Sequence, residues 1–382
     1  MNLSRLCSAP FGHRGREALC WHAHRYVRPE EWSRVTAELE GVAIAAAETR
    51  DCLTDDVRPS PAARVAAPDD LDREERVGRA TVHGTCGELL QGYRRPDGRM
   101  GGSGRHGGSQ DAGGYQHFLF TLPVAEFATT GTVRLDPGQR EPRVIPPDRT
   151  RALTAAVSAA RALGLTSAQV DLEIASNIPV GKGCASSTAD VMASIAALLD
   201  ATHTQTPDAV VHAFGGLVAK DIEWGDYLFS DSVALCLQRS HTLVREYETD
   251  LRWRIVSVDE GGVVDTAQFH ERQRASRRQA QHFDLLARQL DTALRTGDYV
   301  TAAQIGTESA LINQRELPKR TMPVMRRVAA HTGALGLAVA HTGTVIGLIF
   351  SEHQDDAALR MQESFRLLEA DGLAPRTLSV RE

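Results

Sequence analysis

The chain has 382 residues, 42% of them hydrophobic and 24% charged, and a formal net charge of −6 at pH 7. This balance is typical of a soluble globular protein with room for two domains, and the charge gives no electrostatic reason to expect nucleic acid or an anionic membrane as a partner. No apolar run approaches the length of a membrane span, no apolar signal-peptide core opens the chain, and six cysteines are scattered without disulfide or metal spacing. We therefore expect a cytoplasmic protein with reduced thiols.

Two segments are not expected to contribute to a packed core. Residues 1–77 have mixed charge and stretches rich in proline and alanine; within them, 28–50 could form one helix and 59–78 reads as a linker. We predict a partly disordered N-terminal extension over 1–77. The glycine-dense insert at 97–114 is either a mobile flap or an inert loop, and the inert loop is favoured.

The first predicted element, 79–93, reads as a strand that runs into a turn and a short helix. Residues 118–135 are strand material, and 151–164 carries apolar residues at helical spacing up to Gly164, which is a natural helix stop. Residues 169–176 alternate apolar with acidic side chains, and this alternation predicts a half-buried strand.

A helix is predicted to begin within 179–190, and another ends at Gly297. Residues 335–350 read as two buried strands joined by a tight turn. The inward face of the last predicted helix consists of Ala358, Met361, Phe365 and Leu368. Strands and helices alternate without a regular βαβ rhythm, so the predicted fold class is α+β.

The stretch PVGKGCASSTAD at 179–190 joins a predicted strand to a predicted helix. Glycines let the backbone approach a ligand, and the free N–H groups of a helix's first turn favour a phosphate. The hydroxyl groups of Ser186, Ser187 and Thr188 add donors, and one hydroxyl can also bind Mg²⁺. A capping serine is the alternative, but a cap needs one such residue and not this combination. We therefore predict an anion site, although the spacing matches neither G-x-x-x-x-G-K-[ST] nor G-x-G-x-x-G.

This stretch resembles the second signature of the GHMP small-molecule kinases, whose common form is P-x-x-x-G-[LM]-[GA]-S-S-[AT], and it is most similar to the form found in the L-threonine kinases of cobalamin synthesis. Three further stretches resemble that family's N-terminal, middle and C-terminal segments: GTCGELLQG (84–92), VDEGGVVDT (258–266) and AVAHTGTVIGLIF (338–350). The resemblance implies a two-domain GHMP kinase fold after the extension. An ATP-binding domain of the ribosomal protein S5 domain 2-like type is expected over 78–245, and a ferredoxin-like C-terminal domain over 246–382.

The resemblance also implies ATP and Mg²⁺ as cofactors, with the triphosphate over the turn between loop and helix. The ATP-binding residues that it implies are Pro179, Gly181, Lys182, Gly183, Cys184, Ala185, Ser186, Ser187 and Thr188. Of these, Ser187 would also be a Mg²⁺ ligand. Lys182 could place a charge beside the phosphates or could be a solvated loop lysine, and both interpretations stay open. Cys184, like Cys86, is interpreted as a core-filling thiol and not as a nucleophile, because no His and Asp partners are legible beside it.

The segment KDIEWGDYLFSD (220–231) takes the place where the threonine kinases show a form like I-E-P-[ST]-D-G. The resemblance makes Glu223 a metal ligand and Asp226 the catalytic carboxylate beside the acceptor hydroxyl. Asp226 would either take the hydroxyl proton or only orient the group. The departures from the family form are Trp224, Gly225 and Tyr227, and the rival carboxylates are Asp221 and Asp231.

For the acceptor pocket, the resemblance points to Glu88 and Gln91 in CGELLQG and to His341 and Thr342 in HTGT. The carboxylate of Glu88 could pair with an amino group, or the residue could cap a helix, and these alternatives stay open. The HTGT segment would close over the phosphates or over the acceptor.

The function implied by the resemblance is an ATP- and Mg²⁺-dependent phosphotransferase that acts on the alcohol group of L-threonine and gives O-phospho-L-threonine for cobalamin biosynthesis. A second hypothesis keeps the fold and takes homoserine, another hydroxy amino acid or a specialised-metabolite precursor as the acceptor. A third is a catalytically silent sensor that binds a nucleotide and a partner protein. The expected ligand partner is a small hydroxy amino acid, with neither nucleic acid nor a membrane, and a homodimer stays open.

Overall fold

The computed structural model describes residues 75–94, 115–203, 206–219, 221–223, 225–264, 277–340 and 342–381. The glycine-dense insert 97–114 lies outside these residues, and so does the N-terminal extension up to residue 74, so the predictions made for both stay predictions. The chain divides into two compact units. Unit 1 contains Met1–Thr81, Thr130–Ala175 and Asp190–Glu223, and unit 2 contains Val82–Thr129, Ser176–Ala189 and Trp224–Glu382.

The elements alternate between strands and helices along the chain. The strands are β1 (Arg76–Arg94), β2 (Gln116–Leu135), β3 (Arg143–Ile145), β4 (Val170–Ser176), β5 (Ala234–Leu237), β6 (Thr242–Glu246), β7 (Trp253–Asp259), β8 (Gly336–Val339), β9 (Val345–Ser351) and β10 (Arg376–Ser379). The helices are α4 (Thr150–Ala162), α5 (Ser186–Ala201), α6 (Asp208–Ala219), α8 (Arg277–Thr296), α9 (Tyr299–Asn313), α10 (Met322–Thr332) and α11 (Ala357–Ala370).

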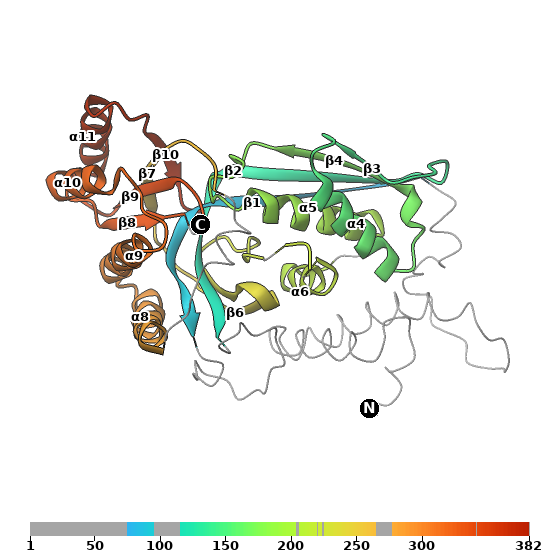
Figure 1. The fold of residues 1–382 in the computed structure, drawn as a ribbon, viewed down its shortest axis with the longest axis horizontal. Helices are drawn as coiled ribbons and strands as arrows, with labels where there is room; N and C mark the ends of the chain where they lie inside the picture. Colours follow the sequence, from blue (N-terminus) through green and yellow to red (C-terminus); the bar gives the residue numbers. More distant parts are fainter. Residues whose placement is uncertain are drawn as a thin grey trace. The chain divides into compact units, whose positions relative to one another are not determined.

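Unit 1 is built from alanine-rich helices packed on strands. In it β3 pairs with β4 in parallel and β4 neighbours β2, with α4, α5 and α6 on one side of these strands (Figure 1). Small residues permit close packing, since a Cβ added at Gly131 of β2 would stand 2.7 Å from the backbone oxygen of Ala193 in α5. Helix α4 ends at Ala162, shortly before Gly164, whose φ of +75° suits a glycine. The predicted helix and its stop are confirmed.

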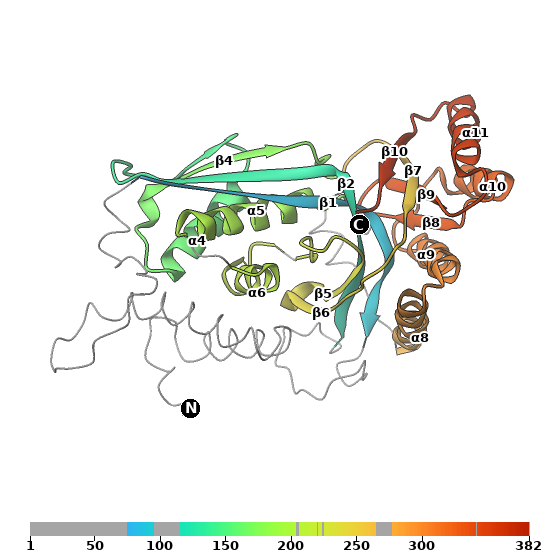
Figure 2. The same cartoon turned by 180° about the vertical axis from the view of Figure 1, so that it is seen from behind.

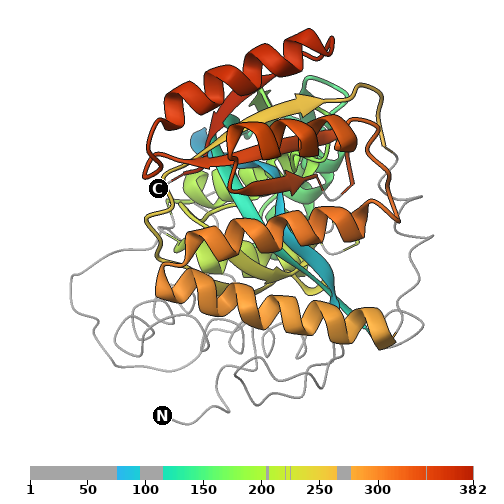
Figure 3. The ribbon, with the colours of Figure 1, turned by 90° about the vertical axis from the view of Figure 1, so that its left-hand side faces the viewer.

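In unit 2 the strand order is β10-β7-β9-β8-β1-β2, and β5 and β6 continue from β2. Strands β7, β8 and β9 pair in antiparallel fashion, and β8 also pairs with β1 through Glu88 and Val339. Helices α8 to α11 flank these strands (Figure 2), and α8 and α9 lie side by side (Figure 3). The hydrophobic core between the strands and α9 to α11 includes Val256, Ala310, Met325, Val328, Leu337, Ile346, Leu348, Phe350 and Leu368.

Several predicted elements of unit 2 are confirmed. The two buried strands predicted within 335–350 are β8 and β9, and every residue of both strands is buried. Helix α8 ends at Thr296, next to Gly297, whose φ is +74°. No helix among the residues described is long and apolar enough to cross a membrane.

Two predictions in unit 2 are wrong in detail. The short helix predicted within 79–93 is absent, because β1 continues through this stretch and pairs with β8 at Glu88. Gly87 bends the chain there with a φ of +75°, in a position where a Cβ would come 2.5 Å from the backbone of Val339. In α11 the predicted inward residue Ala358 is exposed, whereas Leu368 is buried, so the helix meets the core mainly with its second half.

Candidate functional site

The stretch that links β4 to α5 forms a loop with an unusual backbone, here called the glycine loop (residues 179–185). Its φ angle is positive at every second residue, +70° at Gly181, +74° at Gly183 and +62° at Ala185. Such alternation directs successive N–H groups to one side and forms a concave site for an anion. Helix α5 begins directly after it at Ser186, so the free N–H groups of its first turn follow the loop.

The predicted hydroxyl groups stand in the first turn of α5. Ser186 and Thr188 are buried, with 9% and 4% of their surface exposed, and Ser187 is half-buried. Ser187 is therefore the most accessible of the three. This exposure agrees with its predicted role as a ligand of Mg²⁺, although the role itself stays a prediction.

The turn at residues 342–344 lies directly against the glycine loop. A Cβ added at Gly343 would stand 1.9 Å from the backbone oxygen of Lys182, a distance that no side chain tolerates. The backbone N–H of Thr344 donates to the same oxygen at 3.1 Å. From the other side, a Cβ at Gly183 would stand 2.7 Å from the Cβ of Ala340. The 342–344 turn thus packs directly against the backbone of the glycine loop. His341 lies outside the described residues, and Thr342 is buried.

Lys182 is not a solvated loop lysine, because its side chain is engaged within the protein, and its predicted contact with the phosphates stays a prediction. Its ammonium pairs with Asp259 Oδ2 at 2.8 Å and donates to the backbone oxygen of Gly262 at 2.7 Å. The backbone N–H of Val264 also donates to the oxygen of Gly181 at 3.4 Å. Lys182 therefore ties the glycine loop to the end of β7 and to the turn that follows it.

Asp259 is a site residue that the sequence analysis did not single out. Burial alone would raise the pKa of its carboxyl, but hydrogen bonds from Lys182, Thr344 and Gly261 together lower the pKa below its ordinary value. Thr344 Oγ1 donates to Asp259 Oδ1 at 2.5 Å and the Gly261 N–H donates to it at 2.9 Å. One carboxylate thus holds the glycine loop, the 342–344 turn and its own turn together. Its only sequence signal was its place in the VDEGGVVDT motif.

Strand β1 supports the far end of the glycine loop. The backbone N–H of Thr85 donates to the oxygen of Cys184 at 3.1 Å, and a Cβ at Gly84 would stand 2.8 Å from the same oxygen. Cys184 is buried, and this burial raises the pKa of its thiol to about 12. Burial also raises the pKa of the Cys86 thiol. Both thiols therefore stay protonated at neutral pH, which confirms their interpretation as core residues.

Glu88 and Asp226 are two buried carboxyl groups of unit 2, and because the charge of one acts on the pKa of the other they are here called the acid pair. Glu88 is 2% exposed and Asp226 is 8% exposed. Burial, with a further contribution from the charge of Asp226, raises the pKa of Glu88 well above its ordinary value. Glu88 Oε2 has no hydrogen-bond partner among the residues described, and Asp226 Oδ1 accepts from Gln238 Nε2 at 3.4 Å. Glu88 lies on β1 three residues after Thr85, whose N–H donates to the Cys184 oxygen of the glycine loop.

The position of Glu88 excludes the helix cap and leaves open the pairing of its carboxylate with an amino group. Because Glu88 belongs to a strand, it caps no helix. Gln91, on the same strand, is 5% exposed, and its backbone N–H donates to Ser309 Oγ of α9 at 3.3 Å. The predicted roles of Glu88 and Gln91 in an acceptor pocket remain predictions, and both side chains are buried.

Gly225, which departs from the family form I-E-P-[ST]-D-G, stands where the structure leaves no room for a side chain. A Cβ at this position would stand 2.3 Å from the ring of His241, and the Gly225 N–H donates to the backbone oxygen of Gln238 at 3.2 Å. Tyr227 is buried at 2% exposure, and Trp224 lies outside the described residues. The segment that carries Asp226 is therefore packed tightly against the end of β5.

Glu223, the second predicted metal ligand, belongs to unit 1 and pairs with Arg151 at 3.1 Å. Within the described part of the chain, no group of three or more His, Cys, Asp or Glu side chains is arranged to hold a metal ion. Mg²⁺ does not require such a group, because it is commonly bound by one or two protein oxygens and by the phosphates of a substrate. Ser187 fits that mode, and the role of Glu223 stays a prediction.

Comparison with known proteins identifies one domain and the fold. Residues 151–228 match the family model described as GHMP kinases N terminal domain. Among curated proteins, no sequence matches this chain. The family match includes the glycine loop, the first turn of α5 and Asp226.

Solved structures resemble the chain over most of its length. Mevalonate pyrophosphate decarboxylase from Streptococcus pyogenes has a TM-score of 0.59 at 15% identity and covers 81% of this chain and 98% of its own. Homoserine kinase from Cytophaga hutchinsonii has a TM-score of 0.52 at 15% identity, with 80% and 94% covered. Mevalonate kinase from L. major, solved with R-mevalonate, has a TM-score of 0.53 at 14% identity, with 81% and 96% covered. These similarities confirm the α+β GHMP kinase fold.

Gly343→Ala tests the support of the glycine loop. The added Cβ would collide with the Lys182 carbonyl, so we expect a melting temperature several degrees lower. We also expect a non-hydrolysable ATP analogue with Mg²⁺ to raise the melting temperature of the native chain and not that of this variant. Gly138→Ala is the matched control, because a Cβ there meets only the Asp136 side chain. Equal stabilisation of both variants by the nucleotide would contradict the assigned role of Gly343.

Proposed function

We propose that this protein is an ATP- and Mg²⁺-dependent kinase that transfers the γ-phosphoryl group to the side-chain hydroxyl of L-threonine and gives O-phospho-L-threonine. The observation that carries the proposal is the glycine loop, with its three positive φ angles at the leading edge of α5. In this proposal the product serves cobalamin biosynthesis in the cytoplasm. The partner of the site is a small hydroxy amino acid.

The glycine loop supplies most of what phosphoryl transfer asks of a protein. Such transfer depends on alignment and on neutralising the charge of the phosphates, and little covalent chemistry is left to the protein. Backbone N–H groups of residues 181–186 would hold the phosphates, and the N-terminus of α5 would favour their negative charge. Bound Mg²⁺, with Ser187 as one ligand, would neutralise charge on the phosphate oxygens.

Lys182 contributes to this site indirectly. Since its ammonium is already paired with Asp259, it holds the backbone of the glycine loop in position instead of meeting the phosphates. Gly343 and Thr344 complete the support from the other side. A loop held in this way loses little conformational entropy when a nucleotide binds.

The acid pair supports an acceptor that carries an ammonium group. Glu88 is buried, its Oε2 has no hydrogen-bond partner among the described residues, and its electrostatic neighbour is another acid. A buried acid of this kind is compensated when a ligand brings a positive charge. A hydroxy amino acid brings such a charge, whereas mevalonate carries a carboxylate and no ammonium. The acid pair therefore favours an amino acid over a mevalonate-like acceptor.

In the transfer itself, the acceptor hydroxyl oxygen forms a bond to the γ-phosphorus while the bond from that phosphorus to the bridging oxygen of ADP breaks. The hydroxyl proton passes to Asp226, or leaves after the transfer while Asp226 only orients the oxygen. Gln238 holds the Asp226 carboxylate, and Gly225 is packed against His241, so this carboxylate stands on a rigid segment. L-homoserine offers the same ammonium and hydroxyl groups and is the second candidate.

An acceptor panel tests the proposed function. ADP release is measured with L-threonine, L-serine, L-homoserine and R-mevalonate as acceptors, and we expect the highest kcat/KM for L-threonine and none for R-mevalonate. A preference for L-homoserine would keep the kinase and change its acceptor. Binding of ATP with no turnover of any acceptor would favour the silent sensor and contradict the proposal.

Two substitutions separate nucleotide use from catalysis. Ser187→Ala should raise the KM for MgATP about tenfold, because a metal ligand is lost. Asp226→Ala should lower kcat about 10²- to 10⁴-fold and leave ATP binding intact, since the carboxylate acts on the acceptor hydroxyl. Asp231→Ala is the control, because Asp231 is exposed and pairs with Arg381. Native rates from the first two variants would show that both roles are misassigned.

Glu88→Gln tests the acid pair through pH. In the unfolded chain Glu88 ionises near its ordinary pKa of 4.5, whereas the folded chain keeps the proton to a higher pH. The folded state then binds more protons, so its stability falls as the pH rises from the unfolded pKa towards the folded pKa. We expect the free energy of unfolding of Glu88→Gln to exceed that of the native chain by an amount that grows as the pH rises above 4.5.

The same variant should raise the KM for the amino acid about tenfold or more, because glutamine cannot become a carboxylate for the ammonium group, and the KM for MgATP should stay unchanged. Parallel stability curves for the two proteins, or an equal rise of both KM values, would contradict the role given to Glu88.

A further inference from the structure

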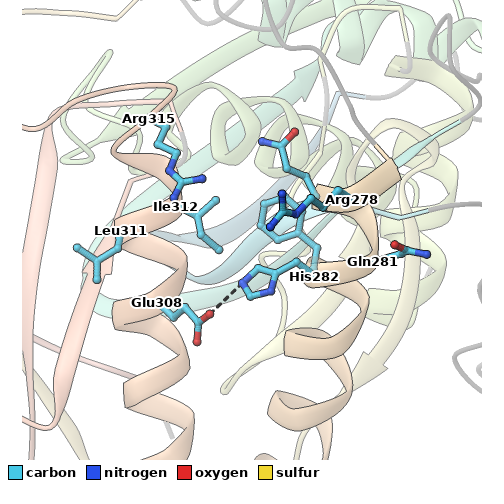
Figure 4. A pocket seen from close by; sticks show the side chains of 9 residues that line it. Arg278, Gln281, His282, Glu308, Leu311, Ile312 and Arg315 are labelled. Atoms are coloured by element: carbon cyan, nitrogen blue, oxygen red, sulfur yellow. Dashed lines mark ion pairs between the residues drawn. The ribbon is translucent and has the colours of Figure 1, made fainter.

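A cleft opens between α8 and α9 in unit 2, outside the site described so far. Its volume is about 720 Å³, which is within the range of small-molecule binding sites. Arg278, His282 and Phe283 of α8 line one side, and Glu308, Ile312 and Arg315 of α9 and the turn after it line the other (Figure 4). None of these side chains has a role in the proposed kinase reaction.

The cleft has an apolar base and a basic rim. Phe283 is 6% exposed, and Ile312 is partly buried beside it. His282 Nε2 and Glu308 Oε1 pair with each other at 2.9 Å across the cleft, so the acid of the lining is already engaged (Figure 4). Arg278 and Arg315 have no acidic partner among the residues described. Two guanidinium groups above an apolar base suit an anion with an apolar body.

Both walls of the cleft contact the end of β1. The same strand carries Gln91 and Glu88, the latter a member of the acid pair. Phe283 packs on Gly92, where an added Cβ would stand 2.6 Å from its ring, and its ring meets that of Tyr93 edge-on at 5.3 Å. Tyr93 OH also donates to Gln279 Oε1 of α8 at 2.8 Å.

The second wall reaches the same strand through α9. Ser309, one residue after Glu308 of the cleft, accepts the hydrogen bond from the Gln91 N–H. A ligand that moved α8 against α9 would therefore displace residues 91–93, next to the predicted acceptor pocket.

We propose that the cleft between α8 and α9 is a second binding site, for a small anion with an apolar body, and that its occupation alters the affinity of the acceptor site through the end of β1. The binding step is independent of the proposed kinase function. The coupling step rests on that function, because it is read out through the acceptor.

Isothermal titration with phenyl phosphate tests the binding step. The full chain is first saturated with a non-hydrolysable ATP analogue and Mg²⁺, so that the glycine loop is occupied. We expect binding of phenyl phosphate that Arg278→Gln with Arg315→Gln weakens about tenfold or more, since both charged hydrogen-bond donors are lost. Arg288→Gln, at an exposed position of α8, should bind as the native chain does. Inorganic phosphate should bind more weakly than phenyl phosphate, because it leaves the apolar base uncovered.

Three results would overturn the binding step: no heat of binding in the saturated chain, binding that the double variant leaves unchanged, or inorganic phosphate that binds as tightly as phenyl phosphate. For the coupling step, saturating phenyl phosphate should change the KM of the acceptor at least about threefold in the native chain and not in the double variant. An unchanged KM would overturn the coupling alone. If no acceptor is phosphorylated at all, the proposed kinase function fails, while the titration still decides the cleft.

Discussion

The contact on which the rest of the site depends is between two backbones, that of the glycine loop and that of the 342–344 turn. Gly343 meets the Lys182 carbonyl so closely that no side chain fits, and Asp259 then joins both segments through Lys182 and Thr344. Gly181 and Gly183 adopt a positive φ without strain, whereas the positive φ of Ala185 is costly and is held by the surrounding contacts. Lys182, whose role the sequence left open, is joined to Asp259 and so takes part in this support.

The acid pair adds a second constraint, of charge. A carboxyl as deeply buried as Glu88 is destabilised when ionised, and the charge of Asp226, which acts on its pKa, has the same sign. Buried carboxyl groups of like charge are typical of functional sites, where a cationic group of a substrate compensates their charge. Under the proposed function, the acid pair therefore separates classes of acceptor by their charge. It does not distinguish L-threonine from L-homoserine, which differ in carbon skeleton and not in ionic groups.

Local features of the site were predictable from sequence, and long-range ones were not. Glycine spacing and the hydroxyl run predicted a loop that opens onto a helix, and α5 begins at the first serine of that run. The helix expected around Glu88 was wrong because pairing with β8 outweighs local propensity. No sequence pattern could assign Lys182 to Asp259, since that ion pair joins residues far apart in the chain. Likewise, the sequence showed only that Gly225 departs from the family form, and its contact with the ring of His241 gives the steric reason.

The burial of Cys184 has a consequence for chemical reactivity. This thiol belongs to the glycine loop itself, and its raised pKa leaves almost no thiolate at neutral pH. Because Cys184 is 1% exposed, we expect alkylating reagents and oxidants to modify it only when the glycine loop moves away from Thr85. The rate at which Cys184 is modified therefore measures how often the glycine loop opens.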